Sequence, residues 1–254
     1  MSSSSSRPRS VVCLSGGMDS CVTAAVAARD TDFYAVHFSY GQRTEARELT
    51  AARGVAIALG ARDFLHLKID LFRRIGGSAL TDTQIAVPDA GETFEGRGDA
   101  GLSSGEAGSG SAENTVPVTY VPFRNAHFLS AAVSWAEVLG ATRIYIGAVE
   151  QDSSGYPDCR PAYYQAFQQV IATGTRDGQI QIETPLIALS KAEIVRLGLE
   201  SKAPLDLTWS CYRDEQAACG ACESCVLRLR AFRAAGVTDP IPYAPTANRA
   251  AQGL

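Results

Sequence analysis

The sequence predicts an α/β fold in which a mainly parallel, doubly wound sheet is covered by helices on both faces. Short apolar runs alternate with helical stretches along most of the chain, as in repeated strand–helix–strand units. The first unit has an apolar strand at 11–14, a Ser-Gly-Gly turn at 15–17 and a helix at 21–29. Beyond residue 200 the character changes and four cysteines gather, which predicts a small C-terminal helical appendage.

The same patterns predict the remaining elements. Strands are expected at 33–38, 64–69, 143–147 and 180–184, and helices at 45–59, 126–139, 161–172 and 191–199. Gly60 is a typical residue to end the helix at 45–59. We therefore expect an α/β domain over 10–200 and a zinc-binding C-terminal region over 201–254, with a boundary near Ser201.

Two segments are too polar to bury a core face. Residues 1–9 hold a run of serines followed by Arg-Pro-Arg and are predicted to be a disordered tail. Residues 90–113 are rich in Gly, Ser, Glu and Ala and are predicted to be a mobile surface loop.

Composition and charge exclude several functions. Hydrophobic residues make up 46% of the 254 residues, and the net charge of −4 disfavours a broad nucleic-acid footprint. No apolar run reaches the roughly 20 residues of a membrane span, and the start has no secretory h-region. We expect a cytoplasmic protein without a membrane or direct nucleic-acid partner.

The turn after the first strand has the composition of an anion-binding loop. In Ser15-Gly16-Gly17-Met18-Asp19-Ser20, glycines let backbone N–H groups approach a ligand, and the following helix directs its positive end to the same place. The Gly-Lys-Ser/Thr of a Walker A loop is missing. The alternative is a plain turn in which Ser and Asp cap the helix.

Four of the seven cysteines form a Cys-x7-Cys-x2-Cys-x2-Cys array: Cys211, Cys219, Cys222 and Cys225. Such spacing presents three thiolates on one side of a turn that enters a helix, and a fourth completes a tetrahedron. Four thiolates leave no open position, so the predicted zinc is structural. An iron–sulfur cluster also uses four cysteines, and the spacing alone does not exclude it. Cys13 and Cys21 are expected to pack in the core.

Three further segments carry polar groups suited to a substrate. Residues 152–160, after the strand at 143–147, combine a carboxylate, an aromatic ring and a guanidinium, which suit a purine-like base, or else form a plain polar turn. Arg124 and Asn125 precede a helix and suit a phosphate or a carboxylate. Ser190 and Glu193 predict a capping box, and Lys191 beside them is a candidate phosphate contact because it opposes the helix dipole.

These motifs carry two resemblances. The loop Ser15–Ser20 resembles the pyrophosphate-binding loop of the N-type ATP pyrophosphatases, which have the Rossmann-like fold of the adenine-nucleotide alpha-hydrolases. The whole ordered set resembles the 7-cyano-7-deazaguanine synthase family of the queuosine pathway. The matching stretches are Ser15–Ser20, Tyr40–Arg43, Val121–Asn125, Ser154–Arg160, Glu183–Leu186, Ser190–Ile194 and Cys211–Cys225. The sequence departs from the family pattern at Thr44, where a His is usual, and in a longer Gly/Ser-rich loop.

The resemblance implies a ligase that converts 7-carboxy-7-deazaguanine and ammonia, through an amide, to the nitrile preQ0, with two ATP cleaved to AMP and pyrophosphate. It implies ATP contacts at Leu14, Ser15, Gly16, Gly17, Met18, Asp19, Ser20, Cys21, Val22, Thr23 and Ala24. It implies substrate contacts at Gln42, Arg43, Asn125, Tyr156, Asp158, Cys159 and Arg160, with Cys159 as pocket lining. Catalytic roles fall to Lys191, Arg124 and Asp19, the last also for Mg²⁺. A homodimer with one structural Zn²⁺ per subunit is implied as well.

Other readings of the chain remain open. His37 and His66 are expected to be satisfied core residues, whereas the role of His127 is undecided. Without a glutaminase segment, free ammonia is the expected nitrogen donor. A tRNA-thiolating or amide-forming enzyme would keep the phosphate loop with another acceptor. A zinc-stabilised module that binds ATP or a base without turnover is the alternative outside enzymes.

Overall fold

Five parallel strands form the centre of the protein, and their order in the sheet is β3-β2-β1-β4-β5. The computed structural model describes residues 7–90, 116–150 and 156–245. The strands are β1 (Arg9–Cys13), β2 (Asp32–Ser39), β3 (Phe64–Lys68), β4 (Arg143–Ile146) and β5 (Gln181–Glu183). Each lies within a residue or two of the range predicted from its apolar run. The predicted doubly wound α/β fold is confirmed.

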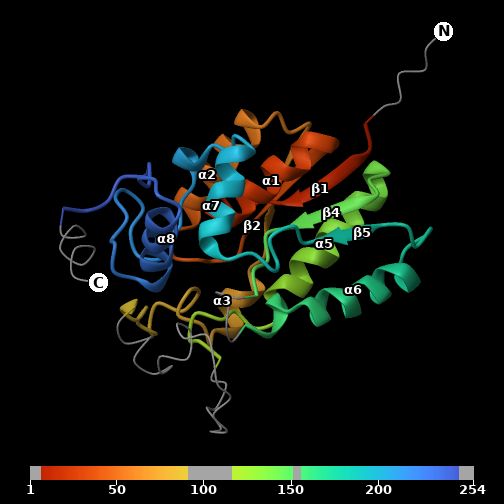
Figure 1. Ribbon diagram of the computed structural model, residues 1–254. Helices are drawn as coiled ribbons and strands as arrows, with labels where there is room; N and C mark the ends of the chain where they lie inside the picture. Colours follow the sequence, from red (N-terminus) through yellow and green to blue (C-terminus); the bar gives the residue numbers. More distant parts are fainter. Residues whose placement is uncertain (1–6, 91–115, 151–155, 246–254) are drawn as a thin grey trace, which may run out of the picture.

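Helices cover both faces of this sheet (Figure 1). They are α1 (Met18–Asp30), α2 (Glu45–Ala58), α3 (Leu71–Ile75), α5 (Arg124–Leu139), α6 (Pro161–Gly174), α7 (Lys191–Glu200) and α8 (Glu223–Ala234), with 3-10 turns η1 (Pro157–Cys159) and η2 (Leu205–Leu207). The short helix α3 was not predicted, because five residues carry no helical period. The capping box at Ser190 and Glu193 is confirmed.

Successive side chains of β1 belong to opposite layers of the core. Val11 packs in the layer of α5 and α6, together with Leu129 and Ile171. Val12 packs in the layer of α1 and α2, together with Ala24 and Val55. Both valines are fully buried. A continuous apolar strand is therefore what a parallel sheet with two covered faces requires.

The chain reverses its winding direction on the two sides of β1. Val12 pairs with Ala35 of β2 on one side and with Tyr145 of β4 on the other. Loops that leave the carboxyl ends of these strands turn to opposite faces and open a crevice between them. The Ser15–Ser20 loop and the segment after β4 meet at this crevice.

The C-terminal region shares its core with the α/β region. Phe232 of α8 packs with Ile194 of α7 and Val22 of α1 in one buried cluster. The predicted boundary near Ser201 coincides with the end of α7 at Glu200. The division into two domains stays a prediction, because no separate core marks it among the described residues. Residues 1–6 of the predicted tail and 91–113 of the predicted loop lie outside the described residues.

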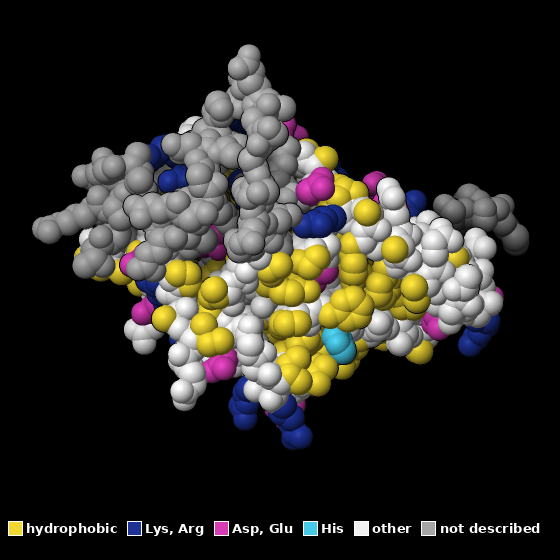
Figure 2. Space-filling model, turned by 90° about the horizontal axis from the view of Figure 1, so that it is seen from below, with side chains coloured by type: hydrophobic (Ala, Val, Ile, Leu, Met, Phe, Trp, Pro, Cys, Tyr) yellow, Lys and Arg dark blue, Asp and Glu magenta, His cyan; other side chains and the backbone are white. Residues whose placement is uncertain are grey.

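One face carries many apolar side chains (Figure 2). Exposed hydrophobic residues include Leu71 and Ile75 of α3 and Phe123 at the start of α5, which is 59% exposed. In the described parts of the chain no helix is long and apolar enough to cross a membrane.

A buried ion pair ties the end of the described chain to α8. Arg228 donates to both carboxylate oxygens of Asp239, at 2.7 Å from Nε and 2.9 Å from Nη2. The two side chains are 2% and 3% exposed. Arg228 also donates to Thr208 Oγ1 at 2.8 Å and to Ser210 Oγ at 3.2 Å. Its position therefore fixes the segment that leads to the first cysteine of the array.

We expect Asp239→Ala to lower the free energy of unfolding by about 3–5 kcal/mol, because it leaves a buried guanidinium without its counter-charge. Urea denaturation measures the change. Asp70→Ala removes an exposed pair with Arg74 and is expected to cost about 0–1 kcal/mol. Equal losses of unfolding free energy in the two variants would show that the buried Arg228–Asp239 pair stabilises the fold no more than the exposed pair does.

Candidate active site

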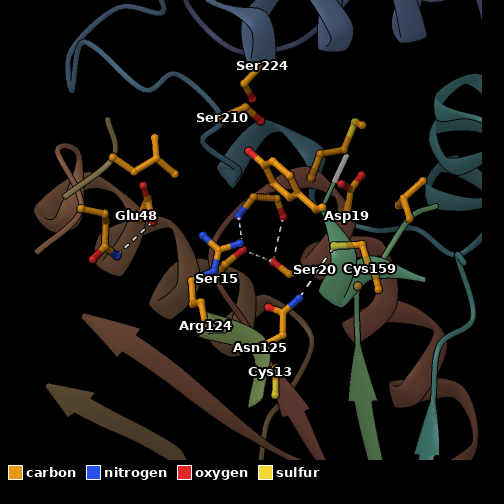
Figure 3. A pocket seen from close by; sticks show the side chains of 18 of the residues that line it. Cys13, Ser15, Asp19, Ser20, Glu48, Arg124, Asn125, Cys159, Ser210 and Ser224 are labelled. Carbon is orange, nitrogen blue, oxygen red and sulfur yellow. Dashed lines mark hydrogen bonds between the residues drawn. The ribbon is translucent and has the colours of Figure 1, made fainter. Parts of the chain in front are cut away.

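A cavity of about 310 Å³ lies at the crevice beyond the carboxyl ends of β1 and β4. Its wall joins the phosphate loop, defined as Ser15–Ser20, to residues from β2, α2, α5, α7 and the C-terminal region (Figure 3). We call it the central cavity. Residues far apart in the sequence therefore face one space, and charged groups of both signs line it.

The phosphate loop holds its shape through its own hydroxyls. Ser15 Oγ accepts the N–H of Gly17 at 3.2 Å and donates to Ser20 Oγ at 3.0 Å, and Ser20 Oγ donates to the carbonyl of Gly17 at 2.9 Å. Gly17 is the N-cap of α1, and among the described residues no side chain caps this helix start. Its first-turn N–H groups are therefore available to an anion.

The residues predicted to contact ATP divide into two groups. Those that line the cavity are Leu14, Ser15, Gly17, Met18, Asp19 and Ser20. Gly16 lies outside this lining, and Cys21, Val22, Thr23 and Ala24 are buried in the core side of α1. Burial raises the pKa of the Cys13 and Cys21 thiols to about 12, so both stay protonated and act as packing residues, as predicted.

Gly16 is the tightest point of the loop. Its φ of +93° is one that side chains rarely adopt, and a Cβ there would lie 2.4 Å from the backbone oxygen of Glu48 in α2. The carbonyl of Gly16 accepts the N–H of Trp209 at 2.9 Å. Only glycine fits between α2 and the C-terminal segment at this position.

Lys191 reaches the phosphate loop from the start of α7. Its Nζ lies 2.7 Å from Asp19 Oδ2, and both side chains are partly exposed to the cavity. Asp19 Oδ1 is buried and has no hydrogen-bond partner within the described residues. This open carboxylate oxygen fits the predicted Mg²⁺, a cation that prefers oxygen ligands.

Arg124 brings a positive charge to the opposite wall. Its Nη1 donates to Tyr40 Oη at 2.9 Å, and the guanidinium lies over the rings of Tyr40 and Phe128 at 5.5 Å and 5.9 Å. No carboxylate lies within ion-pair distance of it in the described part of the chain, and its buried Nε has no partner there. A guanidinium in this state is suited to an incoming anion.

The backbone just before Arg124 is strained. Phe123 has φ 57°, in the left-handed region that non-glycine residues avoid. Its N–H donates to Tyr120 Oη at 2.9 Å. This turn starts α5 two residues earlier than the sequence predicted and directs Arg124 to the cavity.

The predicted substrate residues separate in space. Gln42, Arg43, Asn125, Tyr156 and Cys159 line the cavity. Asp158 is buried behind it, where Oδ2 accepts the N–H of Asn125 at 3.2 Å, and Arg160 is exposed at the start of α6 outside the cavity wall. Residues 152–155 of the same predicted segment lie outside the described residues. The roles of Asp158 and Arg160 in binding stay predictions.

Several wall residues escaped the sequence analysis. Tyr40, Glu48, Trp209, Ser210 and Tyr212 line the cavity. Tyr40 and Tyr212 lie within stretches that match the family, but the sequence analysis assigned no site role to any of the five. Glu48 is an ordinary acidic residue of an alanine-rich helix, and only the packing of α2 against the phosphate loop brings it here. Trp209 carried one available signal, its closeness in sequence to the first cysteine of the array.

The histidines lie away from the cavity lining. His37 is fully buried, and its Nδ1 donates to the carbonyl of Leu14 at 2.9 Å; burial lowers its pKa to about 4, so it is neutral. His66 shares a 2.8 Å hydrogen bond with Ser39. His37 is thus the core residue that was predicted. His127 makes edge contacts with the rings of Phe72 and Phe123.

The four cysteines of the C-terminal array come together. The sulfurs of Cys211, Cys219, Cys222 and Cys225 lie within 4.8 Å of one another. Backbone N–H groups of Arg213 and Cys219 donate to Cys211 Sγ, both at 3.4 Å. Such donors stabilise thiolates, and four convergent sulfurs with this support are able to hold a tetrahedral metal ion. We call them the cysteine cluster.

The strand order 3-2-1-4-5 defines a doubly wound parallel α/β fold. At its switch point the phosphate loop and the start of α1, which has no side-chain cap within the described residues, face a charged cavity. The protein is therefore a doubly wound α/β protein with a phosphate-loop site. The family model described as queuosine biosynthesis protein QueC matches residues 9–236. The chain therefore belongs to the QueC family.

Relatives agree with this assignment over nearly the whole chain. A 7-cyano-7-deazaguanine synthase of Acidobacterium capsulatum is 70% identical over 94% of this chain and 97% of its own length. A 7-cyano-7-deazaguanine synthase of Koribacter versatilis is 58% identical over 93% of this chain and 94% of its own length.

Among solved structures, an NAD+ synthetase from Burkholderia pseudomallei has 13% identity and a TM-score of 0.41 over 97% of this chain and 78% of its own.

We expect Gly16→Ala to lower the free energy of unfolding by about 1–3 kcal/mol from the backbone conformation alone, with a further cost from the clash with Glu48. The matched control is Gly17→Ala, where φ is −76° and the new Cβ would lie 3.4 Å from Ser15 Oγ. This control should stay within about 1 kcal/mol of the parent protein. Urea denaturation compares the two variants, and an unchanged Gly16→Ala protein would contradict the steric argument.

Proposed function

We propose that the protein is a ligase that converts 7-carboxy-7-deazaguanine and ammonia to 7-cyano-7-deazaguanine, with two ATP cleaved to AMP and pyrophosphate. The observation that carries the proposal is one cavity in which the phosphate loop faces Arg124, a guanidinium without a carboxylate partner in the described residues. The names of the relatives support the nitrile product, 7-cyano-7-deazaguanine, and family membership supports a place in queuosine biosynthesis.

The first chemical step is adenylation of the substrate carboxylate. A carboxylate oxygen attacks the α-phosphorus of ATP, and pyrophosphate leaves with the electrons of the broken P–O bond. The first-turn N–H groups of α1, which no side-chain cap occupies within the described residues, would hold the leaving pyrophosphate. Arg124 orients the attacking carboxylate, and Lys191 adds positive charge beside the loop. Asp19 Oδ1 is the oxygen available to Mg²⁺ bound with ATP.

Nitrogen transfer follows on the adenylated acid. Ammonia attacks the carbonyl carbon, and AMP leaves to give the amide. A second adenylation on the amide oxygen then allows AMP to leave again, which produces the nitrile. A cavity of this size that draws its wall from many elements is suited to retain an intermediate between the two steps.

The deazaguanine base is expected along the wall that holds Tyr156, Asn125 and Cys159. Tyr156 donates to or accepts from Thr119 Oγ1 at 2.6 Å, and its ring lies 5.7 Å from that of Tyr120. An aromatic ring held in this way offers a stacking face for the base. Asp158 would act here through Asn125. Its Oδ2 accepts the backbone N–H of Asn125 at 3.2 Å, and its backbone carbonyl accepts the side-chain amide of Asn125 at 3.0 Å.

We further propose that the cysteine cluster holds one structural zinc ion. A closed four-thiolate site has no position for a substrate, so its contribution is to folding. Cys211 is followed by Tyr212 and preceded by Ser210 and Trp209, all of which line the central cavity. Binding of the metal would thereby set one wall of the site.

We also propose that two copies of the chain form a homodimer. The apolar face seen in Figure 2 supports this proposal.

The test of the proposed function is direct assay. Incubation with ATP, Mg²⁺, ammonium and 7-carboxy-7-deazaguanine should give AMP, pyrophosphate and a product with the mass of the nitrile. Arg124→Met keeps much of the apolar contact with Phe128 but removes the charge, and is expected to lower the rate by about 10²–10³-fold. ADP as the nucleotide product, or release of the amide as the final product, would overturn the assignment.

Metal analysis tests the zinc site. Purified protein should contain about one zinc per chain, and Cys225→Ala should lose it because three thiolates no longer close the tetrahedron. The control is Cys21→Ala, whose thiol is buried in α1 away from the cluster, and which should retain the metal. Iron with visible absorption would instead identify an iron–sulfur cluster.

A further inference from the structure

The proposed ligase reaction, on which this inference rests, must dispose of protons. Ammonium and the acyl adenylate give amide, AMP and two protons. The adenylated amide gives nitrile, AMP and again two protons. Pyrophosphate departure does not remove protons from nitrogen, so the phosphate loop alone does not meet this need. A group that accepts protons at the cavity wall is required.

Three carboxylates of the described residues line the central cavity: Asp19, Glu48 and Glu223. Asp19 is engaged by Lys191 at 2.7 Å. Glu223 begins α8 directly after the cluster residue Cys222. Glu48 differs from both, because it rises from the middle of α2 and no lysine or arginine lies within ion-pair distance of it in the part of the chain that the structure describes.

Both oxygens of Glu48 are held by neutral groups. Thr44 Oγ1 donates to Oε1 at 2.8 Å, and Gln42 Nε2 donates to Oε2 at 3.1 Å. Gln42 is itself fixed, since its Oε1 accepts the N–H of Tyr40 at 2.8 Å. The carboxylate is thus oriented without being neutralised, and Figure 3 shows it on the cavity wall together with Ser15 and Arg124.

The same chain of contacts links Glu48 to the cation that would hold the acid. Arg124 Nη1 donates to Tyr40 Oη, and the backbone of Tyr40 is bonded to Gln42, which donates to Glu48. Within the described residues, the cavity therefore presents a guanidinium without an ion-paired anion and a carboxylate without an ion-paired cation. The two substrates that must meet, an anionic acid and ammonium, carry the complementary charges.

We propose that Glu48 binds the ammonium ion and accepts the protons released in nitrogen transfer. Ammonium gives one proton to the carboxylate, and the nitrogen of the resulting ammonia forms the C–N bond with the acyl carbon. The C–O bond to AMP breaks, and AMP leaves with its electron pair. The second proton leaves the new nitrogen for Glu48 after the first has passed to water. The amide nitrogen repeats both transfers as the nitrile forms.

The protonation behaviour of Glu48 agrees with this role. Burial raises the pKa of its carboxyl to about 7, while the hydrogen bonds from Thr44 and Gln42 and the charge of Arg124 act to lower it. The charged and titratable groups that face it are Glu45 on α2, Arg124 on α5 and Tyr40 after β2. An acceptor is most effective when its pKa is near the working pH.

The first experiment separates adenylation from nitrogen transfer. Glu48→Gln should keep substrate-dependent pyrophosphate exchange into ATP within a few-fold of the parent, while amide and nitrile formation from ammonium fall by about 10²-fold or more. Hydroxylamine is uncharged at neutral pH and needs no base to become a nucleophile. It should therefore trap the acyl adenylate as the hydroxamate equally well in the parent and in Glu48→Gln.

Glu45→Gln is the matched control, because Glu45 lies one turn earlier on α2, outside the cavity lining, and its carboxylate accepts the N–H of Gly41 at 3.0 Å. Its ammonium-dependent rate should stay within a few-fold of the parent. If Glu48→Gln uses ammonium as well as the parent does, or loses hydroxamate and nitrile formation equally, the proposal is wrong. A parent protein that fails to adenylate the acid at all would instead refute the proposed function.

A second variant guards against misfolding of the first. Thr44→Val removes a hydrogen bond that favours the charged form of Glu48, so the pKa of Glu48 should rise. Because the charged form is active, the ammonium-dependent rate of the parent should increase with pH through about 7, and the midpoint should move to higher pH in Thr44→Val. An unmoved midpoint would contradict the assignment, since a purely structural role of Thr44 would change the rate without shifting it.

Discussion

The site depends on the close approach of three backbones at Gly16. The loop that follows β1 is pressed against α2 on one side, where a Cβ would lie 2.4 Å from the oxygen of Glu48, and it is bonded to Trp209 on the other. Trp209 lies two residues before Cys211 of the cysteine cluster. A single glycine with positive φ thus couples the anion-binding loop, the helix that carries Glu48 and the segment held by the cysteines.

Charges in the cavity follow a simple division. Lys191 and Asp19 form an ion pair beside the phosphate loop, whereas Arg124 and Glu48 are held by hydroxyl and amide groups and have no ion-pair partner among the described residues. Keeping such groups apart from counter-ions costs folding free energy, because buried charges prefer a partner. Their retention on one cavity is understandable when ionic reactants supply the missing partners.

Local patterns predicted most of the fold but only part of the site. Strand and helix positions follow from short-range apolar periods, and the cysteine cluster follows from the spacing of four cysteines in the short segment Cys211–Cys225, so both are visible in the sequence. Glu48 reaches the cavity through the packing of α2 against the phosphate loop, which no local pattern encodes. Asp158 and Arg160 were predicted from their residue types and from the family resemblance, and the chain places Asp158 behind the cavity wall and Arg160 outside it.

Thr44 shows how a departure from the family pattern is accommodated. In the family pattern that the sequence resembles, a histidine is usual at this position, and Thr44 puts a small hydroxyl side chain in its place. Thr44 is almost fully buried, and its hydroxyl donates to Glu48 Oε1 at 2.8 Å, with the carbonyl of Cys211 as an alternative acceptor at 3.2 Å. A hydroxyl is sufficient to orient a neighbouring carboxylate beside the cluster segment. On this view the position serves to set the geometry and proton affinity of Glu48, so that chemistry persists while the side chain that tunes it varies.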